Sequence, residues 1–261
     1  MINMIKSDIK RLLKSKGFWF SLVIFIFIYV ISIFMQTSAQ ETGTFSPTNS
    51  APEPGFYISI DIVVKSLNSF ATMFGHSFGT LILGIYLAIF VCNEYSSGYI
   101  KNVVTLPNGR LAIIISKIVV AAFIDFIIIL LCYGIGLILG HILIDGFIVE
   151  SMDVLLKSST VMFVMTLALF SLIIVITTVF RNKIAGIILV LLISSGMLQP
   201  FLTSLFDFIH LSFLSEYTLS SLFLNSALVE ENNIIKVIFT SLCYVIVYNA
   251  ISIAITQKRD I

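Results

Sequence analysis

The sequence predicts an all-α integral membrane protein with six transmembrane helices, and three observations support this fold class. Of the 261 residues, 58% are hydrophobic and only 11% are charged, whereas a soluble domain carries about 25% charged residues. Long stretches contain no charged residue at all, and the basic residues gather in alternate connections between them. The net charge of +1 shows no basic footprint for nucleic acid, so we expect no nucleic-acid partner.

The uncharged runs place the spans. Residues 17–40 contain no Asp, Glu, Lys or Arg, and Gly17 to Met35 as a helix rises roughly 28 Å, about one hydrocarbon thickness. The third span differs because it carries Lys117 and Asp125. In order, the predicted spans are about 17–36, 70–92, 111–140, 158–180, 184–199 and 235–256.

The basic residues give the orientation. With the N-terminus inside, eleven of them fall in the inner segments: Lys6, Lys10, Arg11, Lys14, Lys16, Lys101, Arg110, Arg181, Lys183, Lys258 and Arg259. Lys117 lies at the inner end of its span, where we expect its long side chain to reach the membrane surface. The positive-inside rule therefore predicts a multi-pass protein of the cell membrane with both termini cytoplasmic.

The N-terminus is predicted to form an amphipathic helix over residues 1–16. Apolar residues recur at helical spacing, while Lys6, Lys10 and Lys14 occupy other faces. Such a helix lies in the membrane interface with its basic face toward anionic lipid headgroups or a protein partner. A signal peptide is the alternative for the first span, but nineteen apolar residues exceed the usual apolar core of about 7–15 residues.

Two segments are expected on the outer face. Residues 37–65 are polar and contain three prolines, as in an extracellular loop. Residues 198–224 are apolar enough for another span, but that span would move Lys258 outside. Because Gln199-Pro200 breaks the preceding helix, we predict re-entrant or interfacial helices over 198–224.

Ser77 lies in a Gly-x-Ser-x-Gly sequence, the pattern of the nucleophile elbow of serine hydrolases. That motif requires a strand, a turn and a helix, and no strand pattern is present nearby. The same spacing of Gly75 and Gly79 forms a surface for close helix packing, which is the favoured interpretation. An intramembrane hydrolase that uses Ser77 remains the alternative. The sequence contains no P-loop, metal-binding or paired-carboxylate motif, so no catalytic residue or cofactor is assigned to this chain.

Asp125 is the carboxylate predicted at membrane depth. An ionisable residue there is a functional hypothesis by default, either as a proton-coupling group or as part of a transport pathway. The structural alternative is a carboxyl group that forms hydrogen bonds within the helix bundle. Lys117 lies about 12 Å away along the helix, too far to be its partner.

The polar segment 93–110 between the second and third spans carries the most specific pattern. It reads NEYSSGYIKNVVTLPNGR and is followed by Lys117. This resembles the E-[YF]-x-x-G-x-x-K, P-x-x-R and K signature of type-2 ABC exporter permeases. The matching positions are Glu94, Tyr95, Gly98, Lys101, Pro107, Arg110 and Lys117.

The resemblance extends to the whole chain, a single permease domain over residues 1–261. It implies that 93–110 is a cytoplasmic coupling segment that docks on a nucleotide-binding ATPase subunit, with the N-terminal helix and its Lys10 and Lys14 alongside. It also implies a second permease chain, identical or homologous, and ATP with Mg²⁺ bound by the ATPase rather than by this chain.

Residues of the segment suit such docking. Tyr95 and Tyr99 are spaced to share one face of a short helix and fill a groove on a partner, with Glu94 and Lys101 at the rim. Gly98 permits close approach.

The sequence therefore predicts the membrane subunit of an ATP-driven exporter of a hydrophobic or amphipathic substrate. Its size and Ile- and Phe-rich composition resemble small Gram-positive permeases that export, or give immunity to, bacteriocins and amphipathic peptide toxins. A proton-coupled secondary transporter that uses Asp125 is the alternative function.

Overall fold

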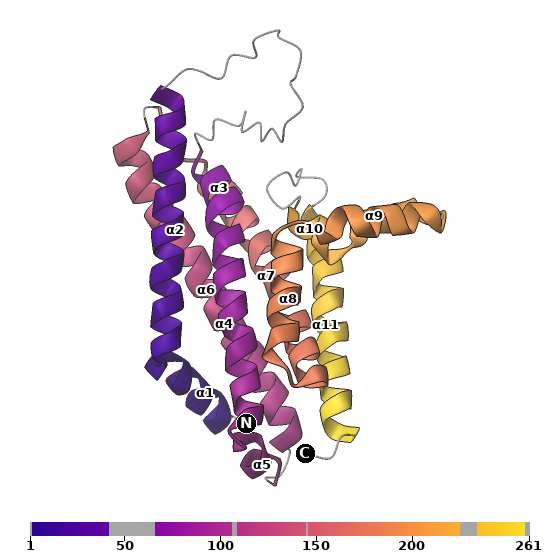
Figure 1. Cartoon of the computed structure of the whole chain (residues 1–261). Helices are drawn as coiled ribbons and strands as arrows, with labels where there is room; N and C mark the ends of the chain where they lie inside the picture. Colours follow the sequence, from indigo (N-terminus) through magenta and orange to yellow (C-terminus); the bar gives the residue numbers. More distant parts are fainter. Residues whose placement is uncertain (1, 42–65, 106–108, 145, 225–233, 259–261) are drawn as a thin grey trace.

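The computed structural model describes residues 2–41, 66–105, 109–144, 146–224 and 234–258, which form a bundle of α-helices (Figure 1). Five of its helices are long and apolar enough to cross a membrane, and a sixth span results if one bent pair counts as a single span. Within the described residues, the extended structure is one isolated bridge between Ser66 and Ile148. The predicted all-α membrane fold is confirmed.

The chain begins with the amphipathic helix α1 (Ile2–Lys14), which meets the first span α2 (Lys16–Glu41) at Ser15. α1 runs at an angle to α2 across one end of the bundle (Figure 1) and packs against α6. Leu12 is buried in the core and Ile9 packs against it, whereas Lys6, Lys10 and Lys14 are exposed. Most of the predicted loop 37–65 lies outside the described residues.

The second span consists of α3 (Leu67–Phe70), the π-helical turn η1 (Ala71–His76) and α4 (Ser77–Ser96). Its glycines allow close approach to α6. A Cβ atom on Gly75 would lie 2.7 Å from Cys132 Sγ, and one on Gly79 would lie 2.7 Å from Ile128 Cγ2. Both positions therefore require glycine for packing, as the small-residue spacing predicts.

The short helix α5 (Tyr99–Val104) leads into the long span α6 (Gly109–Leu143), and α7 (Met152–Phe180) returns across the bundle. The last span, α11 (Ile234–Lys258), packs mainly along α7. α1, α5 and the end of α11 lie at the same end of the bundle (Figure 1), so the described parts near both termini share one side.

The fifth predicted span, 184–199, is shorter than expected. α8 (Lys183–Ser194) ends early, and α9 (Leu198–Phe208) continues at 79° to it. η2 (Ser212–Tyr217) and α10 (Leu219–Leu224) complete the predicted outer segment.

The break in this segment was predicted at the wrong residue. The chain turns at Gly196, whose φ is 73°, and Pro200 lies in the first turn of α9. Proline is tolerated there because the first helical N–H groups have no partner within the helix.

Candidate functional site

The segment that resembles a coupling helix is divided between two helices. Tyr95 lies in the last turn of α4, and Tyr99 begins α5. Gly98 separates them with a φ of 71°, a left-handed conformation that glycine adopts at low cost. The prediction that the two tyrosines share one face of a single helix is therefore wrong, because α4 ends before Gly98 and a separate helix begins after it.

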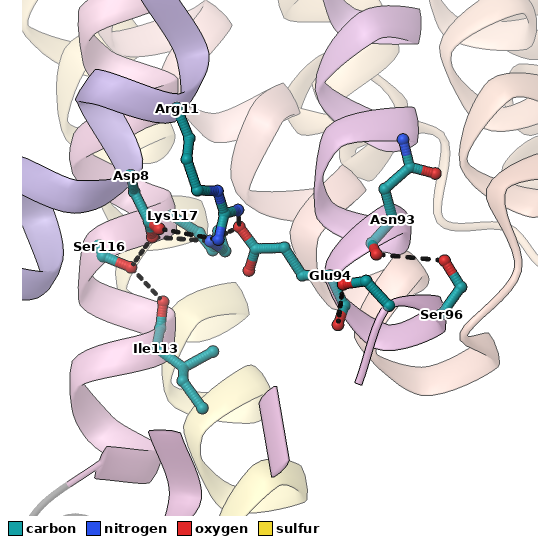
Figure 2. A network of polar contacts seen from close by, with 9 residues as sticks. Asp8, Arg11, Asn93, Glu94, Ser96, Ile113, Ser116 and Lys117 are labelled. Carbon is teal, nitrogen blue, oxygen red and sulfur yellow. Dashed lines mark hydrogen bonds and ion pairs between the residues drawn. The ribbon is translucent and has the colours of Figure 1, made fainter. Parts of the chain in front are cut away.

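Directly behind this turn, four charged side chains meet inside the protein (Figure 2). Asp8 comes from α1, Glu94 from α4 and Lys117 from α6, and they are 0%, 2% and 1% exposed. Lys117 Nζ donates to Asp8 Oδ2 at 2.8 Å and also to Glu94 Oε1. Arg11 of α1 donates to the same Glu94 oxygen and lies 3.6 Å from Asp8 Oδ1. We call these four residues the charge cluster.

The charge cluster is electrically balanced. Two carboxylates face two cations, and Ser116 Oγ adds a hydrogen bond to Asp8 Oδ2 at 2.6 Å. A buried ion pair adds little net stability compared with an apolar pair, but removal of one partner leaves an uncompensated buried charge. We therefore expect the cluster to hold α1, α4 and α6 in register relative to one another.

Aromatic rings enclose the cluster and connect it to neighbouring loops. The Arg11 guanidinium lies 4.3 Å from the centre of the Tyr99 ring and 5.4 Å from that of Phe90. Tyr95 faces the other way, toward the α7–α8 turn, where the Arg181 guanidinium lies 5.7 Å from its ring centre. These are distances at which cations attract aromatic faces.

A small apolar cluster holds α5 against the bundle. Ile100 and Val103 of α5 are buried together with Ile113 and Ile114 of α6. Tyr95 and Tyr99 pack against this cluster from the sides. The exposed surface at the α4–α5 turn consists instead of Asn93, Ser96 and Ser97.

The structure places the other predicted site residues as follows. Lys10 and Lys14 are exposed on α1. Arg110 donates to the backbone carbonyl of Gln257 and so connects the start of α6 to the end of α11. The side chain of Lys101 and residues Pro107 and Asn108 lie outside the described residues. Glu94 is directed into the charge cluster rather than toward the surface.

The prediction for the Lys117 side chain is also wrong. It does not extend to the membrane surface, because Asp8 and Glu94 bind its ammonium group inside the bundle.

Three members of the site were missed from the sequence. Asp8, Arg11 and Ser116 were not assigned a role there, although Asp8 falls among Ile5, Ile9 and Leu12 on the apolar side of the N-terminal helix. A carboxylate on the buried face of an amphipathic helix requires a cation or hydrogen-bond donors, and that signal could have identified it.

Asp125 lies in a second polar group, deeper in the bundle. It is 0% exposed, as is Thr166 of α7, and His76 of η1 is 1% exposed. His76 Nε2 is in hydrogen-bonding contact with Thr166 Oγ1. Ser77, the alternative nucleophile, lies in a continuous helix, which lacks the strand and turn of a nucleophile elbow. Within the described ranges, no group of three or more His, Cys, Asp or Glu residues is placed to hold a metal ion.

Comparison with known proteins supports an assignment. The model of the family described as ABC-2 family transporter protein matches residues 4–199. This range includes most of α1, the charge cluster and the α4–α5 turn. A search of curated proteins found no match. This match covers three quarters of the chain and agrees with its membrane-spanning helices, so the chain belongs to the ABC-2 family of transporter proteins.

Proposed function

We propose that this chain is the permease subunit of an ATP-driven exporter and that an ATPase subunit docks at its α4–α5 turn. The family consists of membrane subunits that work with a separate ATPase. The positions of the charge cluster and the exposed turn support the more specific proposal. Because the basic residues concentrate at this end of the bundle, it faces the cytoplasm under the positive-inside rule.

The observation that carries this proposal is the ion-paired connection behind the turn. A partner that pushes on Ser96 and Ser97 acts on the end of α4, where Glu94 is bound to Lys117 of α6 and Arg11 of α1. The displacement is therefore transmitted to three helices at once instead of being absorbed by a flexible loop. A coupling element requires this property.

The exposed basic residues at this end of the bundle favour an acidic partner surface. Lys6, Lys10 and Lys14 project from α1, and Lys183 follows the α7–α8 turn. Tyr95 and Tyr99 support the docking surface from behind, through Arg181 and Arg11. Glu94 also contributes to the docking site indirectly, because its side chain binds Arg11 and Lys117 behind the surface.

We further propose that two permease chains, identical or homologous, pair with two ATPase subunits. The ATPases bind ATP and Mg²⁺, and their closure rearranges the two helix bundles. The substrate is hydrophobic or amphipathic, such as a bacteriocin or a peptide toxin, and leaves on the side of α9 and α10. The resemblance to small Gram-positive permeases supports this substrate class.

The test is copurification of the permease from the membranes of its native host in mild detergent. We expect a stoichiometric polypeptide that contains a P-loop and hydrolyses ATP. The double variant Ser96→Glu, Ser97→Glu should lose this subunit, because two acidic side chains repel an acidic partner surface without entering the core. The matched control is Ser204→Glu, at an exposed serine of α9, which should retain it.

Two results would contradict the proposal. One is a folded, intact permease from which no ATPase can be isolated. The other is retention of the ATPase by the double variant at the wild-type level.

A further inference from the structure

His76, Asp125 and Thr166 are polar side chains in the apolar interior that the docking site does not use. They come from three different elements, η1, α6 and α7, and all are at most 1% exposed. The turn η1 is π-helical and ends at His76. Such turns are rare and occur frequently at functional sites.

Thr166 connects the other two residues. Its Oγ1 atom contacts Nε2 of His76, and its hydroxyl group also interacts with the Asp125 carboxyl group. The contact with Asp125 does not have the geometry of a full hydrogen bond. Both oxygens of Asp125 and Nδ1 of His76 are buried without a hydrogen-bond partner among the described residues.

Asp125 has no cation beside it in the described part of the chain. Lys117 lies on the same helix about 12 Å away along the axis and is already bound to Asp8 and Glu94. A buried carboxylate without a cation or hydrogen-bond donors is strongly disfavoured, and such a group becomes neutral by taking up a proton.

The other titratable groups near Asp125 cannot take the place of His76 as the proton acceptor. Cys132 lies further along α6 from Asp125, and its carbonyl oxygen accepts a hydrogen bond from Tyr29 of α2 at 3.0 Å. Tyr133 is bound to Asn68 of α3 at 3.0 Å. On the remaining side, the ring of Phe223 of α10 lies 5.5 Å from that of His76. Neither a thiol nor a phenol is a better proton acceptor near neutral pH than an imidazole.

We propose that His76, Thr166 and Asp125 form a proton-binding site inside the membrane, with the proton on Asp125 in this conformation. The transfer requires Asp125 and Thr166 to close to hydrogen-bonding distance; the O–H bond of Asp125 then breaks as one forms on Thr166 Oγ1. The original O–H bond of Thr166 breaks as an N–H bond forms on His76 Nε2. The products are a carboxylate and an imidazolium, and the total charge of the site is unchanged.

The site is linked to the relative positions of the helices. Because its members lie on η1, α6 and α7, any movement that separates these elements interrupts the chain of contacts. Only the connection of this site to transport rests on the proposed function. The bound proton itself is a property of the permease chain and can be measured on it alone.

The test is infrared spectroscopy of the purified permease at neutral pH. We expect the wild-type protein to show the C=O stretching band of a buried carboxylic acid, and Asp125→Asn to lack it. Thr166→Val, which keeps the side-chain shape, should shift this band to higher frequency because the neighbouring hydroxyl group is lost. The matched control is Thr177→Val on the same helix, whose hydroxyl group donates to its own backbone at 2.7 Å and which should leave the band in place.

Two outcomes would overturn the inference. A wild-type minus Asp125→Asn difference spectrum with carboxylate bands alone would show that Asp125 is ionised. A band that Thr166→Val leaves unshifted would show that Thr166 does not contact the acid and that the relay is absent. Neither outcome depends on the ATPase, so failure of this site and failure of the docking proposal are distinguishable.

Discussion

Lys117 is the residue of the charge cluster whose loss should matter most. Its ammonium group is the cation that binds both Asp8 and Glu94 at almost complete burial. Lys117→Met leaves two carboxylates against Arg11 alone, and we expect it to lower the free energy of unfolding by about 3–5 kcal/mol. Thermal unfolding in detergent measures the effect, and Glu94→Gln in the same chain should restore part of it by restoring charge balance.

Lys157→Met is the matched control for this experiment. Lys157 also forms an ion pair, with Asp153 at 2.8 Å, but both side chains are exposed to solvent, at 43% and 73%. An exposed pair contributes about 0–1 kcal/mol, so the two lysine variants should differ clearly. Equal unfolding midpoints would mean that the charge cluster does not hold the helices together.

The surroundings of an individual residue could be predicted from the sequence only where its neighbours are close to it in the chain. Asp125 was recognised as a buried carboxylate because a long uncharged run surrounds it. The partners of Glu94 were not recognised, because Arg11 and Lys117 approach it from helices distant in the sequence. Side-chain direction at the end of a helix depends on these tertiary contacts, which the sequence pattern does not contain.

Among the helices and turns, the junction of α4 and α5 depends on Gly98. Nothing lies within 4 Å of a Cβ atom built there, so a side chain has space and the penalty is conformational. Gly98→Ala forces an L-residue into the left-handed region and should destabilise the protein by about 1–2 kcal/mol. Gly134, which also has open space but lies inside α6, provides the control.

Gly134→Ala should stabilise the helix by about 0.5–1 kcal/mol, because glycine loses more conformational freedom than alanine on folding. Unfolding midpoints of the two alanine variants should therefore move in opposite directions. If both variants lowered the unfolding midpoint by a similar amount, the left-handed conformation of Gly98 would not be the cause of the destabilisation.

Substitutions at the contact between α4 and α6 distinguish two interpretations of the segment Gly75–Gly79. One is a surface for close helix packing, and the other is the nucleophile of a hydrolase. Gly79→Val should destabilise the bundle by about 1–3 kcal/mol, because the added side chain overlaps Ile128 and Phe25. Ser77→Ala, on a half-buried residue between the two glycines, should change stability by less than about 0.5 kcal/mol. It should also leave substrate export unchanged. Loss of activity in Ser77→Ala with a normal unfolding midpoint would support the hydrolase instead.

At the scale of the whole molecule, the orientation in the membrane can be tested by labelling. Cysteines are introduced singly at Lys10 on α1 and Lys157 on α7, in a chain whose exposed Cys243 is replaced by serine; Cys92 and Cys132 are buried. An impermeant maleimide should label position 157 in intact cells and position 10 only after permeabilisation. The reverse pattern would place the charge cluster on the outer side and remove the basis for ATPase docking.

Most of the fold was predictable because a bilayer imposes a simple rule. A span must satisfy its own backbone hydrogen bonds over a fixed thickness, so uncharged runs of sufficient length locate helices. The rule fails where hydrophobicity continues around a bend. Residues 184–206 contain no charge, and only the left-handed conformation of Gly196 shows where α8 ends and α9 turns away.

The shortness of α8 has a consequence for the surrounding lipid. Its 12 residues rise about 18 Å, whereas the hydrocarbon core is about 30 Å thick. α9 then leaves at 79° with no buried residue, so its apolar side chains are available to acyl chains. We therefore expect the bilayer next to α8 to be thinner than elsewhere, and this hydrophobic mismatch should make acyl-chain length a determinant of how easily the bundle rearranges.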